Sequence, residues 1–168
     1  MPSPLSSFDG TSIYLDAMVV AAYFRPESPW HEPSRQLIQR AVDSTRPVRL
    51  VTATLTIDEV VFVLLQELLL DPPFAITHSR SQYLATHPET VRRLSASIDP
   101  PLQAVVDVLS IEPVLPEDIT EMRREMLATG TLPRDAIHLA VMRRLGLTAI
   151  ATADEGFERC GGISAYRP

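Results

Sequence analysis

The sequence predicts an α/β fold, in which helices cover both faces of a central parallel sheet to form a three-layer α/β/α sandwich. Apolar segments of strand length alternate with helix-length patterns along the chain, which is the order that builds parallel sheets. The strand-like segments are apolar enough to be buried between two helical layers. The 168 residues, 45% hydrophobic and 21% charged, suit one globular domain over residues 1–168.

Three segments are predicted to be buried strands, and each follows a turn or a helix-ending signal. They are residues 12–15, 48–53 and 148–152. Residues 111–114 form a weaker candidate, because Pro113 cannot donate a backbone hydrogen bond and so belongs at an edge or a strand end.

Five segments between these strands have helical patterns: residues 17–24, 29–42, 57–70, 116–128 and 133–145. The last two begin with proline, which the first turn of a helix tolerates. Residues 74–109 contain no convincing strand, and we expect two or three short helices there, separated at Pro88 and at Pro100-Pro101. This stretch is predicted to be a helical insertion in the same domain, and residues 1–10 are expected to be flexible.

Charge and cysteine content narrow the classes of function. The net charge of −6 argues against a protein that coats nucleic acid, but bound divalent cations could offset an acidic nuclease site. All fifteen cationic side chains are Arg, which suits phosphate contacts, although biased codon usage is the favoured explanation. A single cysteine, Cys160, excludes an internal disulfide and a thiolate zinc site, so we expect a reducing cytoplasm. No membrane association is expected, since no apolar stretch is long enough to span a bilayer.

Four carboxylates stand out by their position. Asp16 follows the first predicted strand, and Asp154 follows the third. Glu59 and Asp135 lie in the first turns of two predicted helices. Ligands of open parallel sheets bind beyond the carboxyl ends of the strands, so all four side chains could meet at one edge. Hard cations such as Mg²⁺ prefer carboxylate ligands and make hydroxide available from bound water near neutral pH.

Each carboxylate also has a structural interpretation. Asp16 could cap the helix that follows it. Thr56 and Glu59 have the spacing of a capping box, which spacing alone favours over a catalytic role. Asp135 suits a helix N-terminus, and Asp154 lies in an ordinary turn composition. The joint placement of the four acids is therefore a stronger argument than any single residue.

His138 lies on the same helical face as Asp135, and packing is the favoured interpretation over contact with a metal or substrate. The chain contains neither a G-x-G-x-x-G phosphate-binding loop nor a G-x-S-x-G elbow.

Four segments, each containing one of the acids, follow one another in the order of a known family. They are S-I-Y-L-D-A-M-V-V-A-A-Y-F at 12–24, T-A-T-L-T-I-D-E-V-V-F-V-L-L at 52–65, L-P-R-D-A-I-H-L-A-V-M-R-R-L-G at 132–146 and L-T-A-I-A-T-A-D-E-G-F at 147–157. These segments resemble the PIN-domain nucleases and, among them, the VapC toxins of VapBC toxin–antitoxin pairs. Thr152 matches a position that is commonly Ser or Thr in that family.

The resemblance implies an endoribonuclease that depends on Mg²⁺ or Mn²⁺ and leaves a 5′-phosphate and a 3′-hydroxyl. It implies that Asp16, Asp135 and Asp154 supply most metal contacts. Glu59 would bind the metal directly or through water and help to deprotonate the attacking water. It also implies a small antitoxin partner, which the negative charge of the chain would attract through a basic segment.

The chain departs from the family pattern after its first acid, where Ala17 and Met18 replace residues that are usually polar. One alternative is therefore a catalytically weak or silent PIN-fold module that only binds a partner. A second alternative, a haloacid-dehalogenase-like phosphatase, needs D-x-D after the first strand, and Met18 stands in place of its second acid.

The predicted helix 57–70 is apolar nearly all round, so the sheet can cover only one of its faces. Residues 74–109 or a second subunit could cover the rest, and we favour a homodimer. A groove between 17–24 and 57–70 could receive a helix of the antitoxin.

Overall fold

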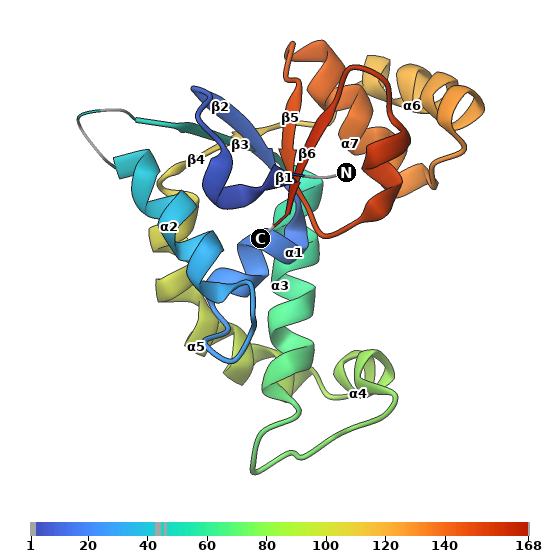
Figure 1. The fold of residues 1–168 in the computed structure, drawn as a ribbon. Helices are drawn as coiled ribbons and strands as arrows, with labels where there is room; N and C mark the ends of the chain where they lie inside the picture. The colour runs from blue at the N-terminus through green and yellow to red at the C-terminus, as the bar shows by residue number, and fades with distance from the viewer. Residues whose placement is uncertain (1–2, 43–44, 46, 168) are drawn as a thin grey trace.

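The computed structural model describes residues 3–42, 45 and 47–167, and its centre is a six-stranded parallel sheet (Figure 1). The strand order is β1-β6-β5-β2-β3-β4, and every neighbouring pair is parallel. The strands are β1 (Ser3–Pro4), β2 (Ser12–Leu15), β3 (Arg49–Ala53), β4 (Leu109–Glu112), β5 (Ala149–Ala151) and β6 (Ser164–Arg167). The predicted α/β class with a parallel sheet is confirmed.

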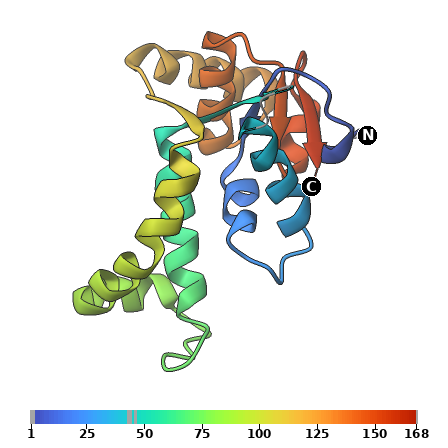
Figure 2. The same ribbon diagram turned by 90° about the vertical axis from the view of Figure 1, so that its left-hand side faces the viewer.

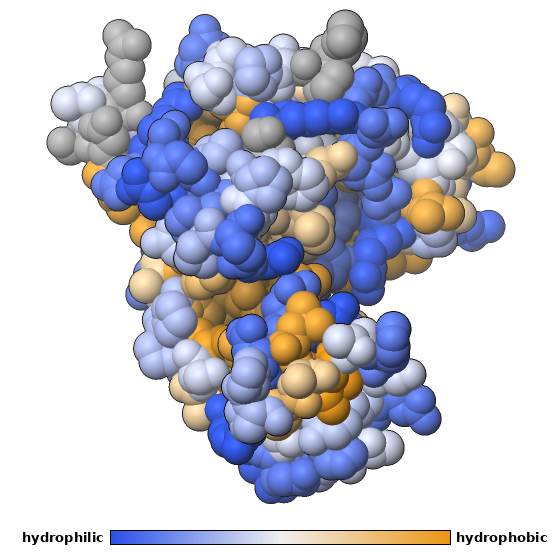
Figure 3. All heavy atoms as spheres, turned by 60° about the horizontal axis from the view of Figure 1, so that its bottom comes forward, coloured by the Kyte–Doolittle hydropathy of each residue, from blue (hydrophilic) through white to orange (hydrophobic). Residues whose placement is uncertain are grey.

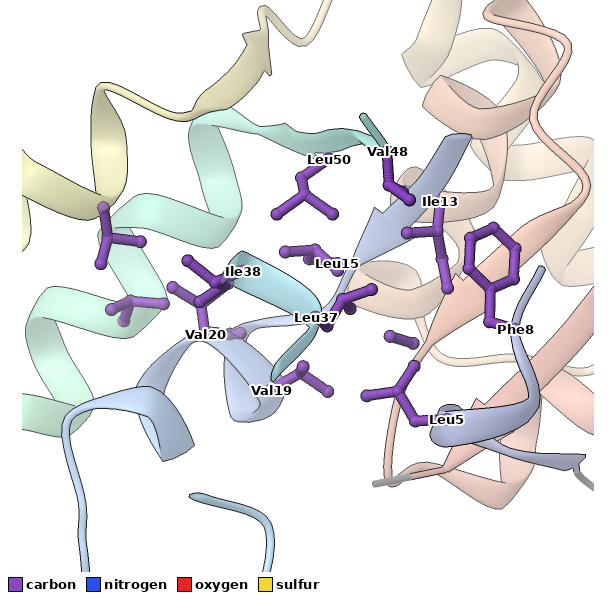
Figure 4. Close-up of a cluster of buried hydrophobic side chains, with 14 of the residues drawn as sticks. Leu5, Phe8, Ile13, Leu15, Val19, Val20, Leu37, Ile38, Val48 and Leu50 are labelled. Carbon is purple, nitrogen blue, oxygen red and sulfur yellow. The ribbon is translucent and has the colours of Figure 1, made fainter. Parts of the chain in front are cut away.

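Helices cover both faces of the sheet, with α6 and α7 on the right in Figure 1 and α1, α2 and α3 below. The helices are α1 (Ala17–Tyr23), α2 (His31–Val42), α3 (Thr54–Leu68), α4 (Arg80–Thr86), α5 (Pro88–Val106), α6 (Pro116–Thr129) and α7 (Pro133–Arg144), with short 3-10 helices η1 (Leu5–Ser7) and η2 (Glu155–Arg159). Successive side chains of β2 point to opposite faces of the sheet, so they belong to two different hydrophobic clusters. Ile13 and Leu15 pack with α1, α2, α3 and α5 (Figure 4), whereas Tyr14 packs with α7.

The helix α7 is buried on nearly all sides, from Ala136 to Met142. Two ion pairs join it to α6: Arg144 Nε lies 2.9 Å from Asp118 Oδ1, and Arg143 Nε lies 3.1 Å from Glu125 Oε1. Because α7 is held firmly against the sheet, the position of its first turn is well defined.

The second half of α3 extends beyond the sheet beside α5, and α4 lies across their far end (Figure 2). We call α4, α5 and residues 61–70 the helical arm. It has its own apolar cluster, in which Leu65, Leu69, Leu84 and Leu94 are buried.

The predicted break at Pro100-Pro101 is wrong, because α5 continues through both residues. A proline inside a helix costs about 3 kcal/mol. Ile98 and Leu102 pack against the core and Val105 is buried there, and this packing offsets the cost of the prolines.

Three further differences concern the ends of elements. The strand predicted at 111–114 is observed as β4, at the edge of the sheet as expected, but it begins two residues earlier than predicted and ends before Pro113. The strands β1 and β6 were not predicted. Residues 3–8 were expected to be flexible, yet Leu5 and Phe8 are buried in the core; residues 1–2 of that segment lie outside the described residues. None of the described helices is both long enough and apolar enough to cross a membrane.

Candidate active site at the carboxyl ends of the central strands

Asp16 directly follows β2, at the point where the chain turns into α1. Its Oδ1 accepts a hydrogen bond of 2.6 Å from the backbone N–H of Ala17, so the predicted capping role is observed. Its Oδ2 accepts a hydrogen bond of 2.7 Å from the hydroxyl of Thr152, which follows the neighbouring strand β5. Burial raises the pKa of Asp16 above its ordinary value, although the Thr152 hydroxyl and the nearby His138 partly oppose this.

Asp154 caps η2, and its Oδ1 accepts a hydrogen bond of 2.6 Å from the backbone N–H of Gly156. The backbone N–H of Asp154 donates to Thr152 Oγ1 over 3.0 Å. The fully buried Thr152 hydroxyl therefore links the segments that carry Asp16 and Asp154. The hydrogen bond from Thr152 gives the Asp16 carboxylate a polar partner, which the side chains of Ala17 and Met18 cannot provide.

Asp135 lies in the first turn of α7 and is partly buried. Its pKa is raised above the ordinary value, first by burial and then by the negative charges of Asp154, Asp16 and Glu59, while His138 acts in the opposite direction. Asp154, Asp16 and Glu59 therefore lie near enough to Asp135 for their charges to act on it. The hydrogen bonds of Thr152 with the Asp16 carboxylate and with the backbone N–H of Asp154 tie two of the four predicted acids to one side chain.

Glu59 lies one turn into α3, with a side chain that is only 10% exposed. The predicted capping box with Thr56 is wrong, because α3 begins at Thr54 and Thr56 is a buried residue inside the helix. The helix starts earlier than expected because β3 leads into it without an intervening turn. Glu59 instead faces α7: its Oε1 lies 2.7 Å from Arg134 Nε, and its Oε2 lies 3.9 Å from His138 Nε2.

The buried His138 connects this acid to the centre of the sheet. Its Nδ1 shares a hydrogen bond of 2.7 Å with the hydroxyl of Tyr14, whereas its Nε2, on the side of Glu59, has no hydrogen-bond partner among the described residues. Burial raises the pKa of the Tyr14 phenol. The packing role expected for His138 is observed, and the side chain also borders the acidic site.

Sequence reasoning did not identify Tyr14 or Arg134 as parts of this region. Tyr14 occupies a strand position where an aromatic side chain needs no functional explanation, and its partner is 124 residues away in the chain. Arg134 directly precedes Asp135, and that adjacency was the available signal.

A hard divalent cation fits the chemistry of the site. The four acids offer oxygen ligands, and the raised pKa values of Asp16 and Asp135 reflect burial and repulsion that a cation would relieve. Glu59 Oε1 is buried without an aligned hydrogen bond, despite its short distance to Arg134. Within residues 3–42, 45 and 47–167, no three Asp, Glu, His or Cys side chains stand close enough together to hold an ion as they are now oriented.

This chain belongs to the PIN-domain family, whose model matches residues 13–163. No curated protein sequence matches it.

Several solved structures share its fold. VapC20 from Mycobacterium tuberculosis, a toxin that cleaves the sarcin–ricin loop, is 18% identical, with a TM-score of 0.56 over 93% of this chain and 99% of that one. FitAcB from Neisseria gonorrhoeae is 14% identical, with a TM-score of 0.55 over 92% and 96% of the two chains. A toxin–antitoxin complex from Klebsiella pneumoniae is 12% identical, with a TM-score of 0.53 over 90% and 94%. At these identities the likeness establishes the fold alone.

Proposed function

We propose that this chain is a metal-dependent endoribonuclease whose active site consists of Asp16, Glu59, Asp135 and Asp154. One arrangement carries the proposal: the Thr152 hydroxyl donates to the Asp16 carboxylate and accepts from the backbone N–H of Asp154, and Glu59 faces the helix that carries Asp135. The four acids come from different parts of the chain. Membership of the PIN family supports a nuclease, and the name of VapC20, which gives that toxin an RNA target, supports RNA as the substrate.

In the proposed mechanism, Asp16, Asp135 and Asp154 would hold a Mg²⁺ or Mn²⁺ ion, and Glu59 would bind it directly or through water. Such an ion would supply Lewis acidity and lower the pKa of the attacking water. Glu59 would accept the proton of that water as its oxygen attacks the phosphorus in line. The P–O3′ bond would break, and the 3′-oxygen would take a proton from solvent, which leaves a 5′-phosphate and a 3′-hydroxyl. Thr152 keeps the Asp16 carboxylate oriented through its hydrogen bond, which is the task of outer-shell groups in metal sites.

The direct test is cleavage of a labelled RNA by the purified chain with Mn²⁺, with Mg²⁺ and with EDTA. Cleavage should need the metal, and Asp135→Asn should reduce it by about a hundredfold or more, at least the loss that follows removal of an outer-shell partner. If calorimetry detected no Mn²⁺ binding and no RNA were cleaved, the silent PIN-fold module would replace the nuclease.

We further propose that the chain is the toxin of a toxin–antitoxin pair in the cytoplasm and that a small antitoxin binds its apolar groove. The groove has a volume of about 780 Å³, and it lies where α1, α3 and α5 meet, so it includes the predicted location between α1 and α3. Phe24, Leu64, Leu68 and Ile98 are among its apolar lining residues. Its charged lining residues are Arg25, Glu27, Glu67 and Asp71, so the groove is net negative although Arg25 pairs with Glu27 and Glu67, and this favours a basic segment. Figure 3 shows apolar surface in a hollow at this end of the molecule.

Growth of cells that express the chain tests the toxin proposal. Expression alone should slow growth, co-expression of the adjacent small reading frame should restore it, and Asp135→Asn should remove the toxicity. If the soluble wild-type chain were harmless with its neighbour deleted, it would be a PIN nuclease outside the toxin branch.

A homodimer remains our proposal for the assembly. The helices α4 and α5 cover part of α3, which is one of the two arrangements predicted from the sequence. Phe62 nevertheless stays 46% exposed on α3, and Met18 stays 37% exposed on α1. Sedimentation at micromolar concentration should detect a dimer, and a single 18.6 kDa species would exclude it.

A further inference from the structure

One arginine of the chain already occupies the acidic site. Arg134 Nε lies 2.7 Å from Glu59 Oε1, and Arg134 directly precedes Asp135 on α7. Among the ion pairs of the described residues, this is the contact that brings an arginine to one of the four acids. A positive charge therefore stands beside the acid proposed to serve the metal.

The side chains of Glu59 and Arg134 differ in their exposure to solvent. The Glu59 side chain is 10% exposed, whereas the Arg134 side chain is 63% exposed. Their contact is short, but it lacks the alignment of a hydrogen bond, since Glu59 Oε1 has no hydrogen-bond partner. Water can solvate the Arg134 guanidinium when it leaves, but the nearly buried Glu59 carboxylate would then carry an uncompensated charge. Arg134 can therefore leave Glu59 once another cation takes its place, while Glu59 stays in position.

We propose that Arg134 exchanges between two partners: it pairs with Glu59 in the metal-free chain and contacts a backbone phosphate of the RNA once a metal has taken over the Glu59 carboxylate. This inference rests on the proposed function and names a regulator and a substrate contact of the same site. A metal and a guanidinium compete for one carboxylate, because each satisfies the same negative charge. Each cation therefore weakens the binding of the other.

The chemistry of the side chain suits its second partner. The observed contact with Glu59 uses Nε, and the guanidinium has four further N–H donors on its terminal nitrogens. Arginine binds phosphate through two parallel hydrogen bonds, a geometry that lysine cannot reproduce. Residue 134 also adjoins Asp135, so a phosphate bound there would lie beside the proposed metal ligands.

Two measurements on Arg134→Ala test the exchange, because the variant should bind metal more tightly and RNA more weakly than wild type. Calorimetry without RNA should show Mn²⁺ binding that is about two- to fivefold tighter than in wild type, the size expected for losing one partly exposed ion pair. The variant should also bind a short fluorescent single-stranded RNA more weakly than wild type does. This second measurement uses Ca²⁺ in place of Mn²⁺, and a gel checks that the RNA stays intact. The slope of log affinity against log salt should fall by about 0.7, the value of one lost phosphate contact on a single strand.

Arg124→Ala is the matched control. Arg124 is 73% exposed on α6 and pairs with Glu121 over 2.8 Å, so its removal deletes the same charge from a comparable ion pair away from the site. It should change neither the Mn²⁺ affinity nor the salt slope. Arg134→Lys should keep the salt slope, because it keeps the charge, but bind RNA more weakly than wild type.

The outcomes separate the two proposals. If wild type binds Mn²⁺ and RNA but Arg134→Ala behaves like Arg124→Ala in both measurements, the exchange is wrong and the nuclease proposal is untouched. If Arg134→Ala weakens Mn²⁺ binding, Arg134 supports the metal site instead of competing with it, and the exchange is again wrong. If wild type binds neither ligand, both proposals fail.

Discussion

The acidic end of the sheet and the helical arm are built on different principles. At the acidic end, polar side chains are placed by the ends of β2 and β5 and by the starts of α3 and α7, and hydrogen bonds such as that from Thr152 to Asp16 fix them. In the arm, position comes from apolar contacts such as those of Leu69, which is fully buried. The difference teaches that the ends of strands and helices set the site, whereas apolar packing dominates in the arm.

The largest expected effect lies in the arm. Leu69→Ala should lower the free energy of unfolding by about 2–5 kcal/mol, because it leaves a cavity in the small apolar cluster. Chemical denaturation measures this loss. Leu127→Ala on α6, where the side chain is 89% exposed, is the control and should stay within about 0.5 kcal/mol of wild type.

The same variant sharpens the comparison between the two regions. Folded Leu69→Ala protein should bind Mn²⁺ with wild-type affinity, since all four acids lie outside the helical arm. A large loss of metal affinity in that variant would mean that the arm also positions the site.

The next effect belongs to the acidic end. Glu59→Gln should fold normally, because the capping box that would have made Glu59 structural is absent, yet it should lose cleavage by about a hundredfold, roughly 2.7 kcal/mol of barrier. Thermal unfolding and single-turnover RNA cleavage measure the two properties. Glu121→Gln, which also alters an acid paired with arginine, should cleave like wild type. Wild-type cleavage by Glu59→Gln would remove Glu59 from the site.

The contrast between these regions also explains what the sequence could predict. The strands β2, β3 and β5 were predicted because their apolar residues are bounded by clear turn signals, and strand topology then placed Asp16 and Asp154 together. The strand β1 has two residues and includes Pro4, and β6 contains polar residues, so neither has a strand pattern of its own. Both strands form by pairing in parallel with each other, and β6 also pairs with β5.

Other errors have the same origin, namely contacts between residues far apart in sequence. The path of α5 through Pro100 and Pro101 depends on packing against the core, which local propensity does not contain. The spacing of Thr56 and Glu59 fits a capping box, but the direct passage from β3 into α3 places Thr56 inside the helix.

A smaller effect is expected where the site meets the core. Tyr14→Phe keeps the ring but leaves His138 Nδ1 buried without its partner at 2.7 Å, which should cost about 1–3 kcal/mol of unfolding free energy. Tyr23→Phe is the control, because the Tyr23 hydroxyl makes no hydrogen bond in the described part of the chain. Equal stability of the two variants would show that the Tyr14–His138 contact is not needed for folding.

The smallest effect concerns repulsion within the acidic end. Asp135→Asn should stabilise the metal-free chain by about 1 kcal/mol or less, because it removes a partly buried charge that the neighbouring acids oppose. Asp16 is a poorer choice for this test, since its carboxylate accepts hydrogen bonds from Ala17 and Thr152 that an amide cannot accept in full. Denaturation in EDTA measures the gain.

The pH dependence of that gain has a definite sign. The folded pKa of Asp135 is raised above 3.8, so folded wild type holds this proton more tightly than the unfolded chain does. Wild-type stability from this group is therefore greatest below pH 3.8 and decreases as the pH rises through the folded pKa. The advantage of Asp135→Asn should be absent at the acid end and complete above the folded pKa. Saturating Mn²⁺ should reverse the order of the two proteins, because the ion stabilises the chain that binds it more tightly. If Asp135→Asn stayed the more stable protein at saturating Mn²⁺, Asp135 would not be a metal ligand.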